Sequence, residues 1–449
     1  MIGQRLLKSL FLGVLSLCLF TLTACSSLPV TASSITHLTL WQGVNPPPNR
    51  DVLQRLVEQF NQTHPQIQVE SLYVGQGDQQ MPKILAAIVG NAAPDLLWQA
   101  PTITGQLVDL EALYPLETWL DASPLKEQLD PSLLESMQLE GHTWSVPFGT
   151  NNVGLFYRPS LFKAAGITTL PKTWADLRQV AKQLTIPAQN QHGMLLPLGK
   201  GEWTVFTWLP FMWSGGGELT AAGDSSLSSL AGSAASSGGR TRVASERSVY
   251  GVEIANPGAI AALSFWRDLI ADGSVVLSSP ERGYELDSFL AGKVAMQLTG
   301  PWTLAQLDAT KVDYGVIPMP AQVRQATSTG GENLFVLKST PQRQQAALVF
   351  AEYVLSEAFQ TEWALGTGYL PVNLRSRRSP AYLQYVAQQP VVSVFLDQAQ
   401  YGRSRPIFPG YNRISDSLGR AIETVLLGKA TPEAALATAQ QRLDLILQR

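Results

Sequence analysis

Short β-rich runs alternate with helical runs along this chain, and this alternation limits the possible folds more than any other feature. From residue 36 onward, Val52, Leu56 and Phe60 recur at the spacing of one face of a helix. Strands and helices in turn predict an α/β domain with a largely parallel sheet. The expected elements are strands at 37–41, 66–74 and 95–98 and helices at 51–60 and 81–91.

The second part of the chain is richer in predicted helices. Thr173, followed three residues later by Asp176, predicts a capping box at the start of a helix. Residues 214–240 are mostly Gly, Ser and Ala, so we expect a surface insertion there. A chain of 449 residues exceeds what one core usually supports, so two domains are expected. Further helices are expected near 259–270, 344–363 and 414–427, with Thr431–Pro432 starting a last one.

The N-terminus predicts export. Basic residues precede an apolar stretch at 10–22 that is too short for an ordinary membrane span, which is typical of a signal peptide over residues 1–24. The stretch ends in Leu-Thr-Ala-Cys, which resembles the lipobox of bacterial lipoproteins. We therefore expect Cys25 to carry a lipid and residues 25–35 to form a flexible tether, with cleavage at another position as the alternative.

The composition argues against several classes of function. The only other cysteine, Cys18, lies in the expected signal peptide, so no disulfide is expected. Charged residues make up 15% of the chain and the net charge is −3, whereas a nucleic-acid partner would need clustered Lys and Arg. The four histidines lack the spacing of metal ligands, so neither a metal nor a cofactor is expected. Catalytic motifs such as a nucleophile elbow are missing, so we do not expect an enzyme.

Aromatic side chains stand among Asn, Gln, Glu and Gly in segments that we expect to be loops at strand ends. Trp203 and Trp208 lie in one such segment, Trp302 follows a Gly-Pro pair, and Tyr369 follows Gly368. Sugars present apolar C–H faces and rims of hydroxyls, so flat rings and amide groups form a complementary surface. Any one of these rings could equally be core packing. As a group they predict a carbohydrate-binding site.

Short segments spread over the whole mature chain carry a family resemblance. They are LTLW at 38–41, PDLLW at 94–98, VPF leading to GLFYR at 146–158, PKTW at 171–174, the segment 289–302 ending in TGPW, and GTGYLP at 366–371. In this order they resemble the extracellular solute-binding proteins of the maltose-binding type, the receptors of ABC importers. The resemblance implies a periplasmic-binding-protein-like fold, in which two α/β lobes are joined by crossover hinge segments with a ligand cleft between them.

The resemblance also implies how the chain is divided. Crossings between the lobes should fall near Thr150–Asn152, Gly330–Gly331 and Gly366–Tyr369, where glycines would allow the unusual backbone angles of a hinge. The N-terminal lobe should comprise residues 36–150 and 331–367, and the C-terminal lobe residues 151–330 and 368–449.

Site residues follow from the same resemblance. Trp302 matches a cleft tryptophan that stacks on a sugar ring, and Asn151 stands where maltose receptors carry a glutamate in the first crossover. Asn45–Pro46 replaces a charged pair of the maltose receptors, which argues against maltose and leaves a disaccharide such as trehalose, an oligosaccharide or a small glycoside. The other expected ligand-binding residues are Trp203, Trp208, Gln99, Gly331, Glu332, Asn333, Tyr369, Arg405 and Tyr411.

Taken together, these expectations describe a monomeric, carbohydrate-binding lipoprotein of an ABC importer. Its partners would be the sugar, the permease subunits and the membrane that holds its lipid, on the periplasmic face in a Gram-negative host. An alternative ligand is glycerol-3-phosphate or a glycerophosphodiester, with Arg405 pairing the phosphate. Arg405 could equally be a structural ion-pair partner that does not contact the ligand. Alternatives outside this class are a non-transport lipoprotein and a tethered glycosidase that uses a carboxylate pair.

Overall fold

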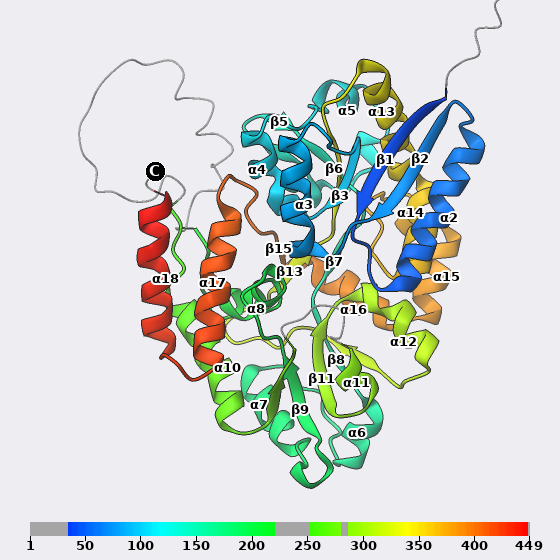
Figure 1. The fold of residues 1–449 in the computed structure, drawn as a ribbon. Coiled ribbons are helices and arrows are strands. Elements are labelled where there is room, and N and C mark those ends of the chain that lie inside the picture. The colour runs from blue at the N-terminus through cyan, green and yellow to red at the C-terminus, as the bar shows by residue number, and fades with distance from the viewer. Residues whose placement is uncertain (1–34, 221–250, 280–285, 448–449) are drawn as a thin grey trace, which may run out of the picture.

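Two lobes, each built on a five-stranded sheet, make up the computed structural model, which describes residues 35–220, 251–279 and 286–447 (Figure 1). The expected signal peptide, Cys25, the tether up to residue 34 and most of the expected insertion lie outside these residues. The N-terminal sheet has the order β2 (Ile67–Tyr73), β1 (Thr36–Gln42), β3 (Leu96–Gln99), β14 (Asn333–Val336) and β6 (Ser145–Pro147). The C-terminal sheet has the order β10 (Val275–Leu277), β9 (His192–Leu196), β11 (Val294–Thr299), β8 (Gly154–Tyr157) and β12 (Gly315–Ile317).

The first lobe confirms the predicted alternation of strands and helices. β1 pairs in parallel with both β2 and β3, and the chain between them forms α2 (Pro47–Thr63) and α3 (Gly77–Val89). Val52, Leu56 and Phe60 of α2 are buried in the core of this lobe. The apolar spacing read from the sequence is therefore the face that α2 turns toward the sheet.

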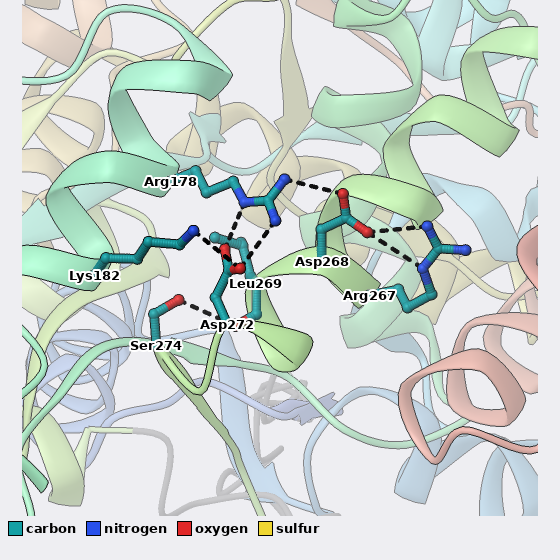
Figure 2. A network of polar contacts seen from close by, with 7 residues as sticks. All are labelled: Arg178, Lys182, Arg267, Asp268, Leu269, Asp272 and Ser274. Carbon is teal, nitrogen blue, oxygen red and sulfur yellow. Dashed lines mark hydrogen bonds and ion pairs between the residues drawn. The ribbon is translucent and has the colours of Figure 1, made fainter.

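The predicted capping box is also confirmed. Thr173 accepts a hydrogen bond from the Asp176 N–H at 3.1 Å and donates its own N–H to the Asp176 carboxylate at 2.9 Å, at the start of α7 (Trp174–Gln183). On the outer face of the lobe, Arg178 of α7 binds Asp272 at the end of α10 (Pro257–Ala271), and Lys182 binds the same carboxylate (Figure 2). The side-chain hydrogen bond from Arg178 is the main reason that the pKa of Asp272 falls to about 2.

The helix expected at 344–363 is in fact two helices, α13 (Pro341–Leu355) and α14 (Glu357–Thr367). Ser356 between them has an extended backbone, with φ −63° and ψ 152°, so it cannot continue a helix. Its Oγ accepts the Phe359 N–H at 3.2 Å and caps the second helix.

A correction concerns Trp203 and Trp208, which were expected in a loop. Both belong to helix α8 (Glu202–Ser214), in which every residue from Thr204 onward is buried. A helix that is apolar all round belongs in a core, and its uniform apolar character hides the helical period in the sequence. Five residues of helix separate the two rings by roughly 140° around the axis, so they face different surroundings.

Each lobe has a core of its own. Leu40, Phe60 and Trp363 belong to the N-terminal core, and Trp208 and Trp266 to the C-terminal one. The last two helices, α17 (Tyr411–Leu426) and α18 (Pro432–Leu447), lie side by side and pack on α8 and α10 (Figure 1). The remaining helices are α4 (Thr104–Asp109), α5 (Glu117–Ala122), α6 (Pro159–Ala164), α11 (Asp287–Leu290), α12 (Leu304–Thr310), α15 (Pro380–Gln388) and α16 (Val391–Gln398), and β4 (Gln138–Leu139) pairs with β5 (His142–Thr143). Within the described ranges, no helix combines the length and the apolar character needed to cross a bilayer.

The segments that join the lobes lie next to one another. In a small third sheet, β13 (Thr327–Gly330) pairs with β7 (Asn151–Asn152) on one side and with β15 (Gly402–Arg403) on the other. Leu370 donates its N–H to Thr150 O at 2.8 Å and accepts the Thr150 N–H at 3.2 Å. The first two expected crossings therefore belong to one hydrogen-bonded layer, and Leu370, the residue after the third, is bonded to the same layer.

Candidate functional site

A cleft of about 1230 Å³, its open mouth included, lies between the lobes. It is placed at the carboxyl ends of β1, β2, β3 and β11, where ligands of α/β sheets usually bind. Both lobes and the crossovers contribute to its wall. The lining residues are Gly43, Asn45, Pro46, Gln76, Gly77, Trp98, Gln99, Ala100, Asn151, Glu202, Trp203, Phe206, Leu286, Asp287, Thr299, Trp302, Thr303, Gln306, Gly330, Gly331, Glu332, Tyr369 and Arg405.

Three aromatic rings form the wall of the cleft on the C-terminal lobe. Trp203 and Phe206 lie three residues apart on α8, which places both on one face of this helix, and Trp302 follows the end of β11. The Trp203 and Trp302 ring centroids are 5.9 Å apart at an interplanar angle of 77°, and those of Phe206 and Trp302 are 6.4 Å apart. Their contacts with one another hold the rings in place, so they offer a rigid apolar surface.

Amide groups with unused hydrogen-bonding atoms lie at the junction of the lobes. Gln99, at the end of β3, accepts the Ala100 N–H through Oε1 at 2.8 Å, while its buried Nε2 has no partner among the described residues. The same holds for Oδ1 of Asn151 in β7 and for Nε1 of Trp98. Buried polar atoms are nearly always paired, so these atoms indicate a site for a polar ligand or for water.

A carboxylate is held at the second crossover by glycine geometry. Gly331 has φ +115°, and a Cβ there would lie 2.1 Å from Gly149 O, so only glycine fits. The next residue, Glu332, accepts a hydrogen bond from the Tyr369 hydroxyl at 3.0 Å. Burial raises the pKa of Glu332 to about 7, and burial together with the nearby Glu332 raises that of Tyr369 well above its usual value.

The one described cationic side chain in the lining, Arg405, is already paired. Its Nη1 donates to Glu202 at 2.5 Å, and its guanidinium carbon lies 4.4 Å from the ring centroid of Phe206. Tyr411 and Ser415 of α17 also donate to the Glu202 carboxylate, Tyr411 at 3.0 Å to Oε1. Only 7% of the Arg405 side chain is exposed.

Eight of the residues expected to bind the ligand line this cleft, and three do not. Trp208 is fully buried in the core of the C-terminal lobe, on another side of α8 from Trp203. Asn333 is buried behind the crossover, where it donates to Ser145 Oγ at 2.8 Å. Tyr411 is buried and supports Glu202 from beneath the cleft. The eight lining residues are Trp302, Trp203, Gln99, Asn151, Gly331, Glu332, Tyr369 and Arg405.

Phe206 and Glu202 are among the lining residues that were not expected from the sequence to bind the ligand. The i, i+3 spacing of Trp203 and Phe206 was available as a signal, but it has meaning only once the segment is recognised as a helix. The pairing of Glu202 with Arg405 joins residues far apart in the chain, and no local pattern indicates it. Among the described residues there is also no group of three or more His, Cys, Asp or Glu side chains arranged to hold a metal ion.

Comparisons with known proteins agree with this architecture. The family model described as bacterial extracellular solute-binding protein matches residues 55–390. A protein of Brucella abortus (strain 2308) named as a binding protein is 25% identical over 342 residues, 75% of each chain. The sn-glycerol-3-phosphate-binding periplasmic protein UgpB of Salmonella typhimurium is 23% identical over 439 residues, 93% of this chain and 94% of that protein.

Solved structures of similar fold include proteins with different ligands. A solute-binding protein of Thermotoga lettingae bound with α-D-tagatose has a TM-score of 0.78 at 22% identity, covering 92% of this chain and 100% of that one. UgpB from Mycobacterium tuberculosis in complex with glycerophosphocholine has a TM-score of 0.77 at 20% identity, covering 92% and 98%. At these identities the likeness shows the fold, and the ligand has to be argued from this cleft.

Proposed function

The chain belongs to the bacterial extracellular solute-binding proteins, and from this premise we propose that it is an ABC-importer receptor that captures a carbohydrate in the cleft between its lobes. One observation carries the choice of ligand. The cleft combines a wall of three aromatic rings with buried amide atoms that have no partner among the described residues. Rings match the apolar faces of a sugar, and unpaired amides match its hydroxyls. The matching family is one of binding proteins rather than enzymes.

The available contacts suffice for useful affinity. A stacked ring contributes about 0.5–1.5 kcal/mol beyond the area it buries, and a net hydrogen bond about 1 kcal/mol. Trp203, Phe206 and Trp302 with hydrogen bonds from Gln99 and Asn151 therefore approach the roughly 8 kcal/mol of a micromolar dissociation constant, once buried area is added.

Capture requires both lobes, because the rings belong to one lobe and Gln99 to the other. We divide the lobes at the crossovers, with residues 36–150 and 331–367 on one side and 151–330 and 368–449 on the other. Asn49 of α2 donates to Trp302 O across the lobes at 3.0 Å. A ligand that contacts both lobes favours the closed population, which is the form the permease would receive.

Delivery would be helped by a membrane tether. The Leu-Thr-Ala-Cys motif supports lipidation of Cys25 after removal of the signal peptide, which would hold a monomeric receptor on the outer face of the cell membrane. Tethering raises the effective concentration of the receptor near its permease. Metabolic labelling with a fatty-acid analogue tests this, since Cys25→Ser should abolish the label while Cys18→Ser should not.

The ligand class is tested by a thermal-shift screen against trehalose, maltotriose, glucosylglycerol and glycerol-3-phosphate, followed by fluorescence titration of each hit. Trp302→Ala should weaken binding of a sugar hit at least about tenfold, the equivalent of about 1.4 kcal/mol. Trp119→Ala is the matched control, because Trp119 is a half-buried ring on α5 outside the cleft. If no carbohydrate raises the melting temperature, the proposal fails.

A second candidate ligand is glycerol-3-phosphate or a glycerophosphodiester. It is favoured by the relatives and the structure that carry the name UgpB and by the presence of Arg405 in the cleft lining. In that case Arg405 would pair the phosphate, and the glycerol-3-phosphate arm of the screen would show the larger shift.

A further inference from the structure

Acidic side chains outnumber basic ones in the lining of the cleft. Among the lining residues, all of which the structure describes, Glu202, Asp287 and Glu332 are acidic and only Arg405 is basic. Asp287 is exposed at the start of α11, whereas Glu202 and Glu332 are partly buried. The described wall of the cleft is therefore acidic on balance, which repels an anionic ligand.

Arg405 does not offer a free positive charge to a ligand, because its guanidinium is already paired with Glu202. Its guanidinium is paired with Glu202 at 2.5 Å and lies against the ring of Phe206, and the side chain is 7% exposed. Its Nε has no partner among the described residues. A phosphate that used Arg405 would have to break this pair and leave Glu202 buried with one partner fewer.

Glu332 adds a carboxylate that is held at the cleft by its backbone and by Tyr369. Its backbone is fixed by the left-handed Gly331 before it and by the Phe148 N–H, which donates to Glu332 O at 2.9 Å. Tyr369 binds Oε2 of the side chain. The carboxyl group can still accept a hydrogen bond from a ligand hydroxyl, whereas a phosphate beside it would meet either a like charge or an unfavourable desolvation.

We propose that this cleft selects uncharged sugars and rejects their phosphorylated forms, with Glu332 as the residue that determines this specificity. The inference rests on the proposed function, because it narrows the ligand class of the same cleft. It separates the carbohydrate candidate from the glycerol phosphate candidate by charge. Arg405 serves as a structural partner of Glu202 under this proposal, not as a phosphate ligand.

The experiment uses two pairs of ligands that differ by one phosphate: trehalose with trehalose 6-phosphate, and glycerol with glycerol-3-phosphate. Binding to the mature protein is measured by calorimetric titration at pH 8, where Glu332 is mostly ionised. We expect trehalose to bind at least about tenfold more tightly than its phosphate, and Glu332→Gln to reduce that ratio at least about threefold. Glu352→Gln removes the same charge from the exposed face of α13 and should leave the ratio unchanged.

The outcomes separate the inference from the function on which it rests. Tighter binding of either phosphate than of its uncharged partner overturns charge selection while the receptor function stands. A ratio that is the same in wild type and Glu332→Gln overturns the role of Glu332. A cooperative melt of each variant at a temperature no lower than that of wild type excludes misfolding as the cause. If neither trehalose nor a wider panel of uncharged sugars binds, the carbohydrate function itself fails.

Discussion

Replacing Glu332 by Gln should stabilise the unliganded protein above neutral pH. Burial raises the pKa of this carboxyl from the usual 4.5 to about 7. Between these two values the folded protein binds a proton that the unfolded chain has released, so folding stability falls as the pH rises through this window. Above pH 7 the loss is complete, and below pH 4.5 it is absent.

The magnitude follows from the width of the window. Each pH unit between the two pKa values costs about 1.4 kcal/mol, which gives up to roughly 3 kcal/mol at pH 8. The hydrogen bond from Tyr369 lowers the pKa of Glu332 and is already included in that value. Gln keeps the shape of the side chain and an oxygen for Tyr369, but it has no proton to lose.

The assay is urea unfolding of both proteins at half-unit steps from pH 4.5 to 8.5. Other groups titrate in the same range, so the quantity of interest is the free energy of unfolding of Glu332→Gln minus that of wild type. This difference should rise with pH and level off above about pH 7.5. A difference that stays flat from pH 5 to 8 would refute the reasoning.

Three further predictions concern the scaffold. Trp208→Ala should lower the free energy of unfolding by about 3–5 kcal/mol, because it empties a fully buried site, and a loss below 1 kcal/mol in urea unfolding would contradict that placement. Gly331→Ala should lower the melting temperature far more than Gly141→Ala. Both glycines have positive φ, but a Cβ at Gly331 would lie 2.1 Å from a carbonyl oxygen, whereas a Cβ at Gly141 would have nothing within 4 Å. Equal melting temperatures of the two variants would count against the steric argument. Asp272→Asn should lower the free energy of unfolding by about 1 kcal/mol at pH 7, because the ion pairs of Asp272 stabilise the fold only while its carboxyl is ionised. The loss should shrink as the pH falls from about 4 toward 2, the range between the usual and the lowered pKa of this group. Urea unfolding at pH 7 and pH 3 checks this, and an equal loss at both pH values would be inconsistent with it.

The sequence predicted those elements of the fold that depend on residues close together in the chain. The apolar face of α2 and the capping box of Thr173 follow from residues three or four positions apart, and both are where the sequence places them. The break at Ser356 was also a local signal, since serine followed by glutamate is typical of a helix start, but the apolar residues on both sides concealed it. Helix α8 was concealed for the opposite reason, because a helix buried on every side shows no amphipathic period.

The site was predictable where it follows strand ends and crossovers, as with Gln99 and Asn151. It was not predictable where a side chain acts through a distant partner. Arg405 carries the same charge in the sequence whether or not Glu202 neutralises it, and only the structure shows that it does. The phosphate role that the sequence suggested for Arg405 therefore rested on a charge that the fold already uses.

The place of β14 in the N-terminal sheet has a consequence for how the protein is made. This strand lies between β3 and β6, and in that sheet β6 pairs only with β14. Yet β14 begins at Asn333, after the chain has passed through most of the other lobe. A nascent chain ending before Asn333 would hold an open sheet edge on β3 and a detached β6, which favours aggregation and slow, non-local folding. The first lobe to leave the ribosome is therefore unable to complete its fold until most of the second lobe has been synthesised.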